Sequence, residues 1–366
     1  MKKISLAYFG SPDFAADFLE KLITDTSMYL PAGRQGRYIE VKLIVTQPDQ
    51  LVGRKQILTP TPVKIVAEKY KITNNTSFPR RRESSLNIPF KKCDYSLDPL
   101  LRGDDKKITL NLELDTLKNI DLALVYAYGD LIPKEFLALP KYGFWNIHPS
   151  LLPKYRGPSP IAAPLINGDK TTGVTIIKMD EDIDHGPIIA QESLTIEIDD
   201  KRPDLEKKLT DLGFEMFKKL IMKGEDTFFE TIARGPLGGV AVEKNGIEPL
   251  NQNHKKAIYT KKLSKQDGFI EFEKLKRALT PSPYLPDEAL AKSGSLTIYN
   301  LFRGLYPWPG LWTMVKPVQL RQLDEAKRLK ITDMELVNGK IIIKKVQLEG
   351  KNEVDFETFN KAYKVF

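Results

Sequence analysis

The sequence ISLAYFGSPD at residues 4–13 is a run of aliphatic and aromatic side chains that ends in a glycine. We expect residues 4–9 to form a buried strand, because so short an apolar run with no polar alternation is typical of a strand covered on both faces. Gly10 is expected to make the turn that follows, with Pro12 near the first position of a helix.

The same alternation of strand and helix continues along the first two-thirds of the chain. Further strands are expected at 41–46, 121–128, 143–148, 173–179 and 188–198, and helices at 14–23, 62–70 and 205–223. Apolar strands that alternate with helices are typical of a parallel sheet covered on both faces. We therefore predict an α/β fold with a doubly wound, mostly parallel, Rossmann-like sheet, in which ligands bind beyond the carboxyl ends of the strands.

Length and composition bound the class of protein. A chain of 366 residues favours two domains, and 41% hydrophobic with 28% charged residues is ordinary for a globular protein. No run of eighteen apolar residues is present, so a membrane-spanning helix is not expected. The single cysteine, Cys93, excludes an intramolecular disulfide and fits a reducing compartment, so we expect a soluble cytoplasmic protein.

The net charge of +8 is unevenly distributed along the chain. Residues 250–366 contain 21 Lys and Arg against 13 Asp and Glu, so the preceding residues are neutral overall. This asymmetry favours chemistry in the first part and polyanion binding in the second, although a modest basic excess can also serve solubility alone.

Domain boundaries are predicted from Gly- and Pro-rich stretches. We expect a catalytic domain at 1–235, a linker at 236–250 and a small basic all-β domain, an OB-like barrel, at 251–366. Three segments without periodicity are interpreted as insertions, near 29–37, 73–107 and 280–295. The second has the composition of a translated genomic repeat and contains Cys93, which is therefore given no catalytic role.

The sequence WNIHPSLLP at residues 145–153 carries the candidate chemistry. Strand alternation places Asn146 and His148 on one side, where an amide can donate to an oxyanion and an imidazole can take a proton from an attacking amine. Further along the chain, Asp184 could orient the imidazole. The alternative is that the histidine is structural and that the acidic turn is a solvated loop.

Other kinds of site find less support in the sequence. Three histidines and one cysteine do not supply a usual zinc set, although a mixed site with aspartates stays open. The Gly10 turn lacks the later glycines of a dinucleotide fingerprint, and no Walker motif occurs.

Six motifs together resemble the folate-dependent formyltransferase family: Asn146-Ile147-His148, Ser150-Leu151-Leu152-Pro153, Arg156-Gly157, Gly168-Asp169, Thr172-Gly173-Val174-Thr175 and Asp184-His185-Gly186. The resemblance implies a doubly wound domain that uses 10-formyltetrahydrofolate and requires no metal. It also implies that Asn146 and His148 engage the formyl carbonyl and that Asp184 sets the charge state of His148. The residues Ser150, Leu151, Leu152 and Pro153 would line the folate pocket.

Two further regions resemble the members of this family that formylate the methionine of initiator tRNA. The first contains Gly53-Arg54-Lys55 between two proline-containing segments, and it is similar to the loop by which those members enter the acceptor stem. The second comprises residues 259–268, 307–310 and 344–347, which are similar to their C-terminal barrel. Arg54, Lys55, Lys261 and Lys262 are the expected tRNA contacts.

The resemblance implies initiator methionyl-tRNA as the partner of a monomeric enzyme. Pro307-Trp308-Pro309 is expected to plug the barrel core rather than to stack on bases. Two alternatives stay open: a formyltransferase for a sugar nucleotide or glycinamide ribonucleotide, and a catalytically silent RNA-binding protein. Neither small substrate needs a cationic loop or a separate basic domain, and a silent protein would be expected to have lost Asn146, His148 or Asp184.

Overall fold

The computed structural model describes residues 2–25, 37–53, 55–72, 74–76, 115–223, 229, 241–243, 246–248, 252–279, 294–316 and 326–366. Two compact units make up the chain, and neither is continuous in sequence. Unit 1 comprises Met1–His148, Ile176–Ala190 and Phe214–Gln252, and unit 2 comprises Pro149–Thr175, Gln191–Gly213 and Asn253–Phe366. Most of the three expected insertions, including Cys93, lies outside the described residues, and the expected domain boundaries stay a prediction.

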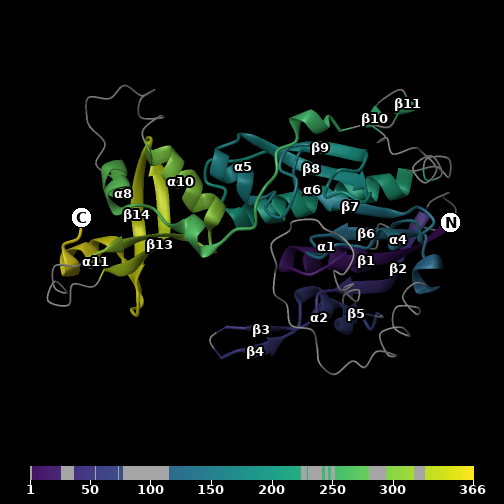
Figure 1. Ribbon diagram of the computed structural model, residues 1–366, viewed down its shortest axis with the longest axis horizontal. Coiled ribbons are helices and arrows are strands. Elements are labelled where there is room, and N and C mark those ends of the chain that lie inside the picture. Colours follow the sequence, from purple (N-terminus) through teal and green to yellow (C-terminus); the bar gives the residue numbers. More distant parts are fainter. Residues whose placement is uncertain are drawn as a thin grey trace, which may run out of the picture. The chain divides into compact units, whose positions relative to one another are not determined.

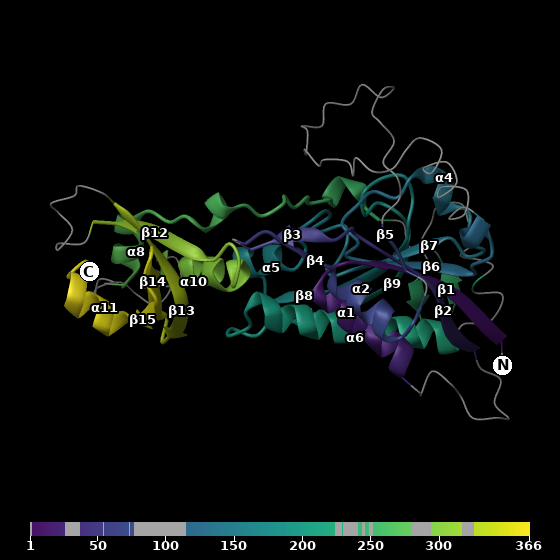
Figure 2. The ribbon, with the colours of Figure 1, turned by 90° about the horizontal axis from the view of Figure 1, so that it is seen from below.

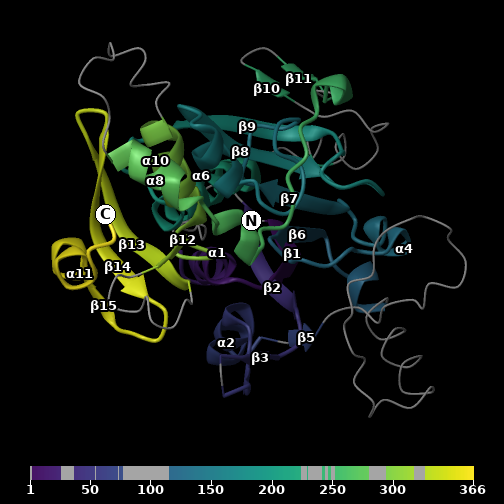
Figure 3. The same cartoon turned by 60° about the vertical axis from the view of Figure 1, so that its left-hand side comes forward.

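Seven strands form one sheet in the order β5-β2-β1-β6-β7-β8-β9, which Figures 1 and 3 show from two directions. They are β1 (Lys2–Gly10), β2 (Arg37–Thr46), β5 (Asn74–Thr76), β6 (Leu122–Tyr126), β7 (Phe144–His148), β8 (Thr171–Lys178) and β9 (Ile188–Thr195). The pairings that join β5, β2, β1, β6 and β7 are all parallel. The six expected strands are confirmed, and β5 lies where the second insertion was expected to begin.

Aromatic side chains attach two helices to one face of this sheet. Phe18 of α1 (Asp13–Thr24) packs 5.3 Å from the ring of Tyr126 in β6 and 5.6 Å from Phe214 of α6 (Arg202–Lys223), measured between ring centroids. Lys218 of α6 also donates to Asp25 after the end of α1, at 2.7 Å. Figure 2 shows the two helices side by side. Both were expected from the sequence.

The opposite face of the sheet is covered as well. Alternate residues of β1, β2, β6 and β7 contribute to a second cluster, into which Phe136 of α4 (Lys134–Leu137) packs. Its buried members are Ala7, Phe9, Leu43, Val45, Leu117, Ile120, Ala123, Val125, Tyr128, Phe136 and Phe144. Helices on both faces confirm the doubly wound arrangement.

The strand order reverses between β1 and β6. From β1 the chain moves outward through β2 to β5, and then returns to the other side of β1 as β6 and continues to β7. Polar groups gather just beyond the carboxyl ends of β1, β2 and β6. Ser11 donates to the carbonyl of Tyr128 at 3.0 Å and accepts from the backbone N–H of Gln47 at 3.2 Å. Ligands of open α/β sheets bind at such a reversal, and β7 ends beside it at His148.

Between β2 and β5 lie a hairpin and a helix. The hairpin pairs β3 (Gln50–Val52) with β4 (Ile57–Thr59) antiparallel, and α2 (Pro62–Lys69) follows it. α2 begins there because Thr61 accepts the backbone N–H of Lys64 at 3.2 Å and Pro62 occupies the first turn, where no backbone donor is needed.

Unit 2 contains a four-stranded antiparallel sheet in the order β12-β13-β14-β15. The strands are β12 (Leu311–Val315), β13 (Lys327–Val337), β14 (Lys340–Leu348) and β15 (Glu353–Asp355). In β14 the side chains of Ile341, Ile343, Val346 and Leu348 are buried, whereas Ile342, Gln347 and the lysines are exposed. The expected C-terminal β domain is confirmed, and its described strands form one open sheet.

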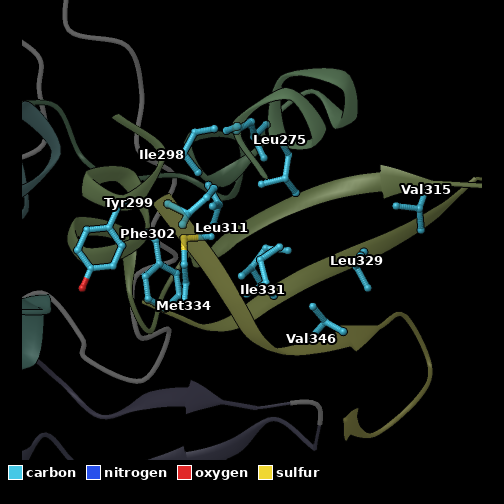
Figure 4. Packing of buried hydrophobic residues seen from close by; sticks show 14 of the residues in the cluster. Leu275, Ile298, Tyr299, Phe302, Leu311, Val315, Leu329, Ile331, Met334 and Val346 are labelled. Carbon is cyan, nitrogen blue, oxygen red and sulfur yellow. The ribbon is translucent and has the colours of Figure 1, made fainter. Parts of the chain in front are cut away.

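The expectation that this region is all-β is wrong, because helices cover the sheet. They are α8 (Phe272–Leu279), α10 (Gly294–Leu305) and α11 (Phe356–Tyr363). Figure 4 shows Leu275 of α8 and Ile298 and Phe302 of α10 packed with Leu311, Ile331 and other sheet residues in one core. An isolated twisted sheet of four strands leaves one apolar face uncovered, and here the helices bury it.

The remaining elements are short: α5 (Ala162–Asn167), β10 (Ala241–Glu243), β11 (Gly246–Glu248), η2 (His254–Lys256) and η3 (Lys265–Gly268). β10 and β11 pair antiparallel inside the segment expected to be a linker. In the part of the chain that the structure describes, no helix is both long and apolar enough to cross a membrane.

The interpretation of Trp308 as a core plug is wrong. Its side chain lies in the turn between α10 and β12 and is 48% exposed. The core of unit 2 is filled instead by the aliphatic and aromatic residues of the sheet and helices.

Two of the three tryptophans, Trp145 and Trp308, allow a matched test of burial. Trp145 is fully buried, stacks on Phe229 with ring centroids 5.8 Å apart, and donates its indole N–H to the carbonyl of Tyr142 at 3.2 Å. Trp145→Ala should lower the free energy of unfolding by about 3–5 kcal/mol. Trp308→Ala should change it by less than about 1 kcal/mol. Urea denaturation measures both, and equal losses would contradict the described packing.

Candidate active site

Asn146, His148 and Asp184 lie together in unit 1. Asn146 and His148 are on the same side of β7, and the side-chain amide of Asn146 donates to Oδ1 of Asp184 at 3.1 Å. The Nδ1 atom of His148 lies 3.4 Å from the same oxygen. The side chains of His148 and Asp184 are only 5% and 12% exposed, so both donors meet a carboxylate that is largely removed from water.

Asp184 is carried by the turn between β8 and β9, and this turn is closely held. Asp184 itself has a left-handed backbone with φ of +49°. His185 contacts the carboxylate of Asp180 at 2.6 Å, and the backbone N–H of Asp182 donates to Asp180 at 3.1 Å. A Cβ on Gly186 would lie 1.9 Å from the carbonyl oxygen of Lys178, so only glycine fits there.

The arrangement suits reaction at a carbonyl. A carboxylate that faces Nδ1 favours the proton on that nitrogen, so Nε2 of His148 is left to accept a proton. The amide nitrogen of Asn146 has two N–H groups, and while one donates to Asp184 the other can donate to a developing oxyanion. The geometry thus allows His148 to serve as a base, Asp184 to orient it, and Asn146 to donate to an oxyanion.

The residues expected to bind the folate, Ser150 to Pro153, lie in the first segment of unit 2. Ser150 is fully buried and donates its hydroxyl to the carbonyl of Lys154 at 2.7 Å. The Thr175 hydroxyl donates to the carbonyl of Ser150 at 2.6 Å and accepts the N–H of Leu152 at 3.1 Å. Gln191 donates to the carbonyl of Leu152 at 3.0 Å. The exposure of Leu151 and Pro153 is intermediate.

Two of these supporting residues were not assigned a role from the sequence. Thr175 belongs to a motif that carries the family resemblance, so a signal existed for it. Gln191 is an ordinary strand residue, and its contact with Leu152 spans 39 positions, so no local pattern could have indicated it.

The expected tRNA contacts are divided between the units. Arg54 lies outside the described residues, whereas Lys55 is exposed in the β3–β4 turn of unit 1. Lys261 and Lys262 are exposed in unit 2. Lys261 forms an ion pair with Asp267, and its hydrogen bond holds the pKa of that carboxyl below its usual value. Part of the charge of Lys261 is therefore compensated within the chain.

Among the residues that the structure describes, no three His, Cys, Asp or Glu side chains gather as the ligands of a metal ion would. The candidate site itself has one carboxylate, one imidazole and one amide, a set suited to proton transfer and oxyanion contact.

Comparison with known proteins agrees with the kind of chemistry that the site permits. Residues 2–221 match the sequence model of the family described as formyl transferase. The chain belongs to this family of formyl-transferring enzymes.

Individual relatives are similar over nearly their whole length. The methionyl-tRNA formyltransferase of Caldicellulosiruptor saccharolyticus is 32% identical over 99% of this chain and 98% of its own length. The methionyl-tRNA formyltransferase of Thermotoga neapolitana is 31% identical over 95% of this chain and 99% of its own length. A solved N-formyltransferase from Helicobacter canadensis, in complex with folinic acid and dTDP-3-aminofucose, is 17% identical over 95% of each chain, with a TM-score of 0.47.

Gly186 allows a test of the turn that carries Asp184. Gly186→Ala should displace the turn, because the new Cβ cannot lie 1.9 Å from a backbone oxygen. A displacement of about 1 Å at a catalytic group can cost about 100-fold in rate, and we expect a loss of formyl transfer of that order. Gly294→Ala is the control, because a Cβ there meets no atom within 4 Å. Equal activity of the two variants would contradict the role of the turn.

Proposed function

We propose that this chain transfers the formyl group of 10-formyltetrahydrofolate to the α-amino group of methionine on initiator tRNA, and so serves translation initiation. The observation that carries the proposal is the buried Asp184 oxygen that meets both Asn146 and His148. The relatives named methionyl-tRNA formyltransferase, which match over nearly their full length, support this acceptor over others.

In the proposed reaction the folate supplies a formyl group on N10 and the methionine amine attacks its carbon. The second N–H of Asn146 donates to the formyl oxygen as negative charge develops there. His148 accepts the proton that the amine loses, and Asp184 stabilises the imidazolium that results. The new carbon–nitrogen bond forms in this attack; the same proton then passes from His148 to N10, and the bond between the formyl carbon and N10 breaks, which releases the formylated amine and tetrahydrofolate. Because these three side chains supply every proton transfer and the oxyanion contact, we propose a reaction that needs no metal.

The segment Ser150 to Pro153 is proposed to line the folate pocket. Its backbone is held by the hydroxyl of Thr175 and the amide of Gln191, and Leu151 and Pro153 keep partly exposed apolar surface. A rigid backbone beside apolar side chains suits a flat aromatic ring system such as the pterin.

The β3–β4 hairpin supports a nucleic-acid acceptor. Leu51, Val52, Ile57 and Leu58 are each 53–62% exposed on it, beside the exposed Lys55. A hairpin that presents apolar side chains and a cation can contact base or sugar surface and phosphate together, and the basic C-terminal region adds further attraction for a polyanion. A sugar nucleotide or glycinamide ribonucleotide would need neither the hairpin nor the basic region.

The protein is further proposed to be cytoplasmic and monomeric.

An assay with purified protein, 10-formyltetrahydrofolate and charged initiator tRNA tests this function. We expect formylated methionyl-tRNA from the unsubstituted chain and a loss of at least about 100-fold in His148→Ala, with tRNA affinity nearly unchanged. Parallel reactions with glycinamide ribonucleotide and an amino-sugar nucleotide serve as comparison. Transfer to either of these but not to tRNA would refute the proposed acceptor.

The hairpin is tested by replacing its apolar cross-strand pair. Leu51 and Leu58 are direct partners across β3 and β4, and both are exposed. Leu51→Ser combined with Leu58→Ser should lower kcat/KM for charged tRNA by about 10-fold or more, since about 1.4 kcal/mol of contact is enough. KM for the folate should not change. Ile198→Ser, at a residue 52% exposed elsewhere, is the control. Normal kinetics of the double variant would exclude the hairpin from tRNA binding.

A further inference from the structure

Gln252 is a buried polar residue that the proposed reaction does not use. It is 5% exposed and stands at the end of unit 1, shortly after β11. Its side-chain amide donates to the carbonyl oxygen of Asp184 at 3.1 Å and to that of Gly186 at 2.7 Å. One amide nitrogen thus serves the two carbonyls on either side of His185.

These two carbonyls belong to the turn that carries the Asp184 carboxylate. Asp184 adopts φ of +49°, in the left-handed region that residues with a Cβ seldom occupy, although aspartate tolerates it better than most. The orientation of that backbone decides whether the carboxylate points at Asn146 and His148. Buried carbonyls without donors would also be costly, so the turn would rearrange if the amide were lost.

The contact is local neither in sequence nor in secondary structure. Gln252 and Asp184 are 68 positions apart, and the bond joins the segment before η2 to the β8–β9 turn. The contact between His185 and Asp180 lies within the turn, whereas Gln252, like Asn146 and His148, contacts the turn from outside it. Gln252 therefore supplies an external anchor for the turn.

We propose that Gln252 is a positioning residue, which keeps the Asp184 carboxylate directed at the amide of Asn146 and the imidazole of His148. The inference rests on the proposed function and adds to it. It assigns a part in catalysis to Gln252, the last residue of unit 1 along the chain.

A substitution that keeps volume but removes the donor provides the test. Gln252→Met should lower kcat for formyl transfer by about 10- to 100-fold, with KM for tRNA and for the folate within about 2-fold. The control is Asn253→Ala, at the exposed neighbouring residue, which should leave kcat and both KM values unchanged. If methionine is not accommodated in the folded protein, Gln252→Ala tests the same expectation: a lower kcat with nearly unchanged KM values.

A double-substitution cycle separates positioning from general support. In an Asp184→Asn background, Gln252→Met should cause little further loss of kcat, because the group through which it acts has already been changed. An equal loss in both backgrounds, an unchanged kcat, or a rise in KM alone would overturn the inference. Failure of the unsubstituted chain to formylate charged tRNA would instead overturn the proposed function, so the two failures can be told apart.

Discussion

The Oδ1 atom of Asp184 is the point on which the candidate site depends. It accepts the amide of Asn146 and faces Nδ1 of His148, within an environment from which water is largely excluded. A carboxylate so placed is costly unless donors compensate it, and here both donors are the groups assigned to the chemistry. In the proposed reaction, the contacts that compensate the charge of Asp184 are therefore the same contacts that position the reacting groups.

That arrangement relies on the rigidity of the sheet beneath it. Trp145 packs between Phe217 and Phe229 on one face of β7, and Phe144 packs against Phe9 on the other. The strand that carries Asn146 and His148 is thus fixed by aromatic contacts on both sides. Groups held on a rigid strand keep their geometry better than groups on a loop, and the loop-borne Asp184 has its own anchors in Gly186 and Gln252.

Outside the candidate site, several large apolar side chains are exposed to solvent. Apolar residues are exposed on the β3–β4 hairpin, and Trp308 is half-exposed in a turn of unit 2. Neither position has a role in the core of its unit. In the proposed function, the exposed apolar side chains of the hairpin and the neighbouring Lys55 would contact the bases and phosphates of the tRNA.

Local patterns in the sequence determined the strands and helices of the doubly wound sheet, because periods of 2 and 3.6 residues report which side of an element is buried. They also determined the pairing of Asn146 with His148, since two residues two positions apart in a strand share a side. The helices over the C-terminal sheet and the exposure of Trp308 were not predicted, because burial there depends on which faces meet. Only the tertiary structure decided that Asp184 reaches both partners through one oxygen and that Thr175, Gln191 and Gln252 hold the surrounding backbone. Contacts between residues tens of positions apart form when the folded chain brings them together, and they leave no periodic trace in the sequence.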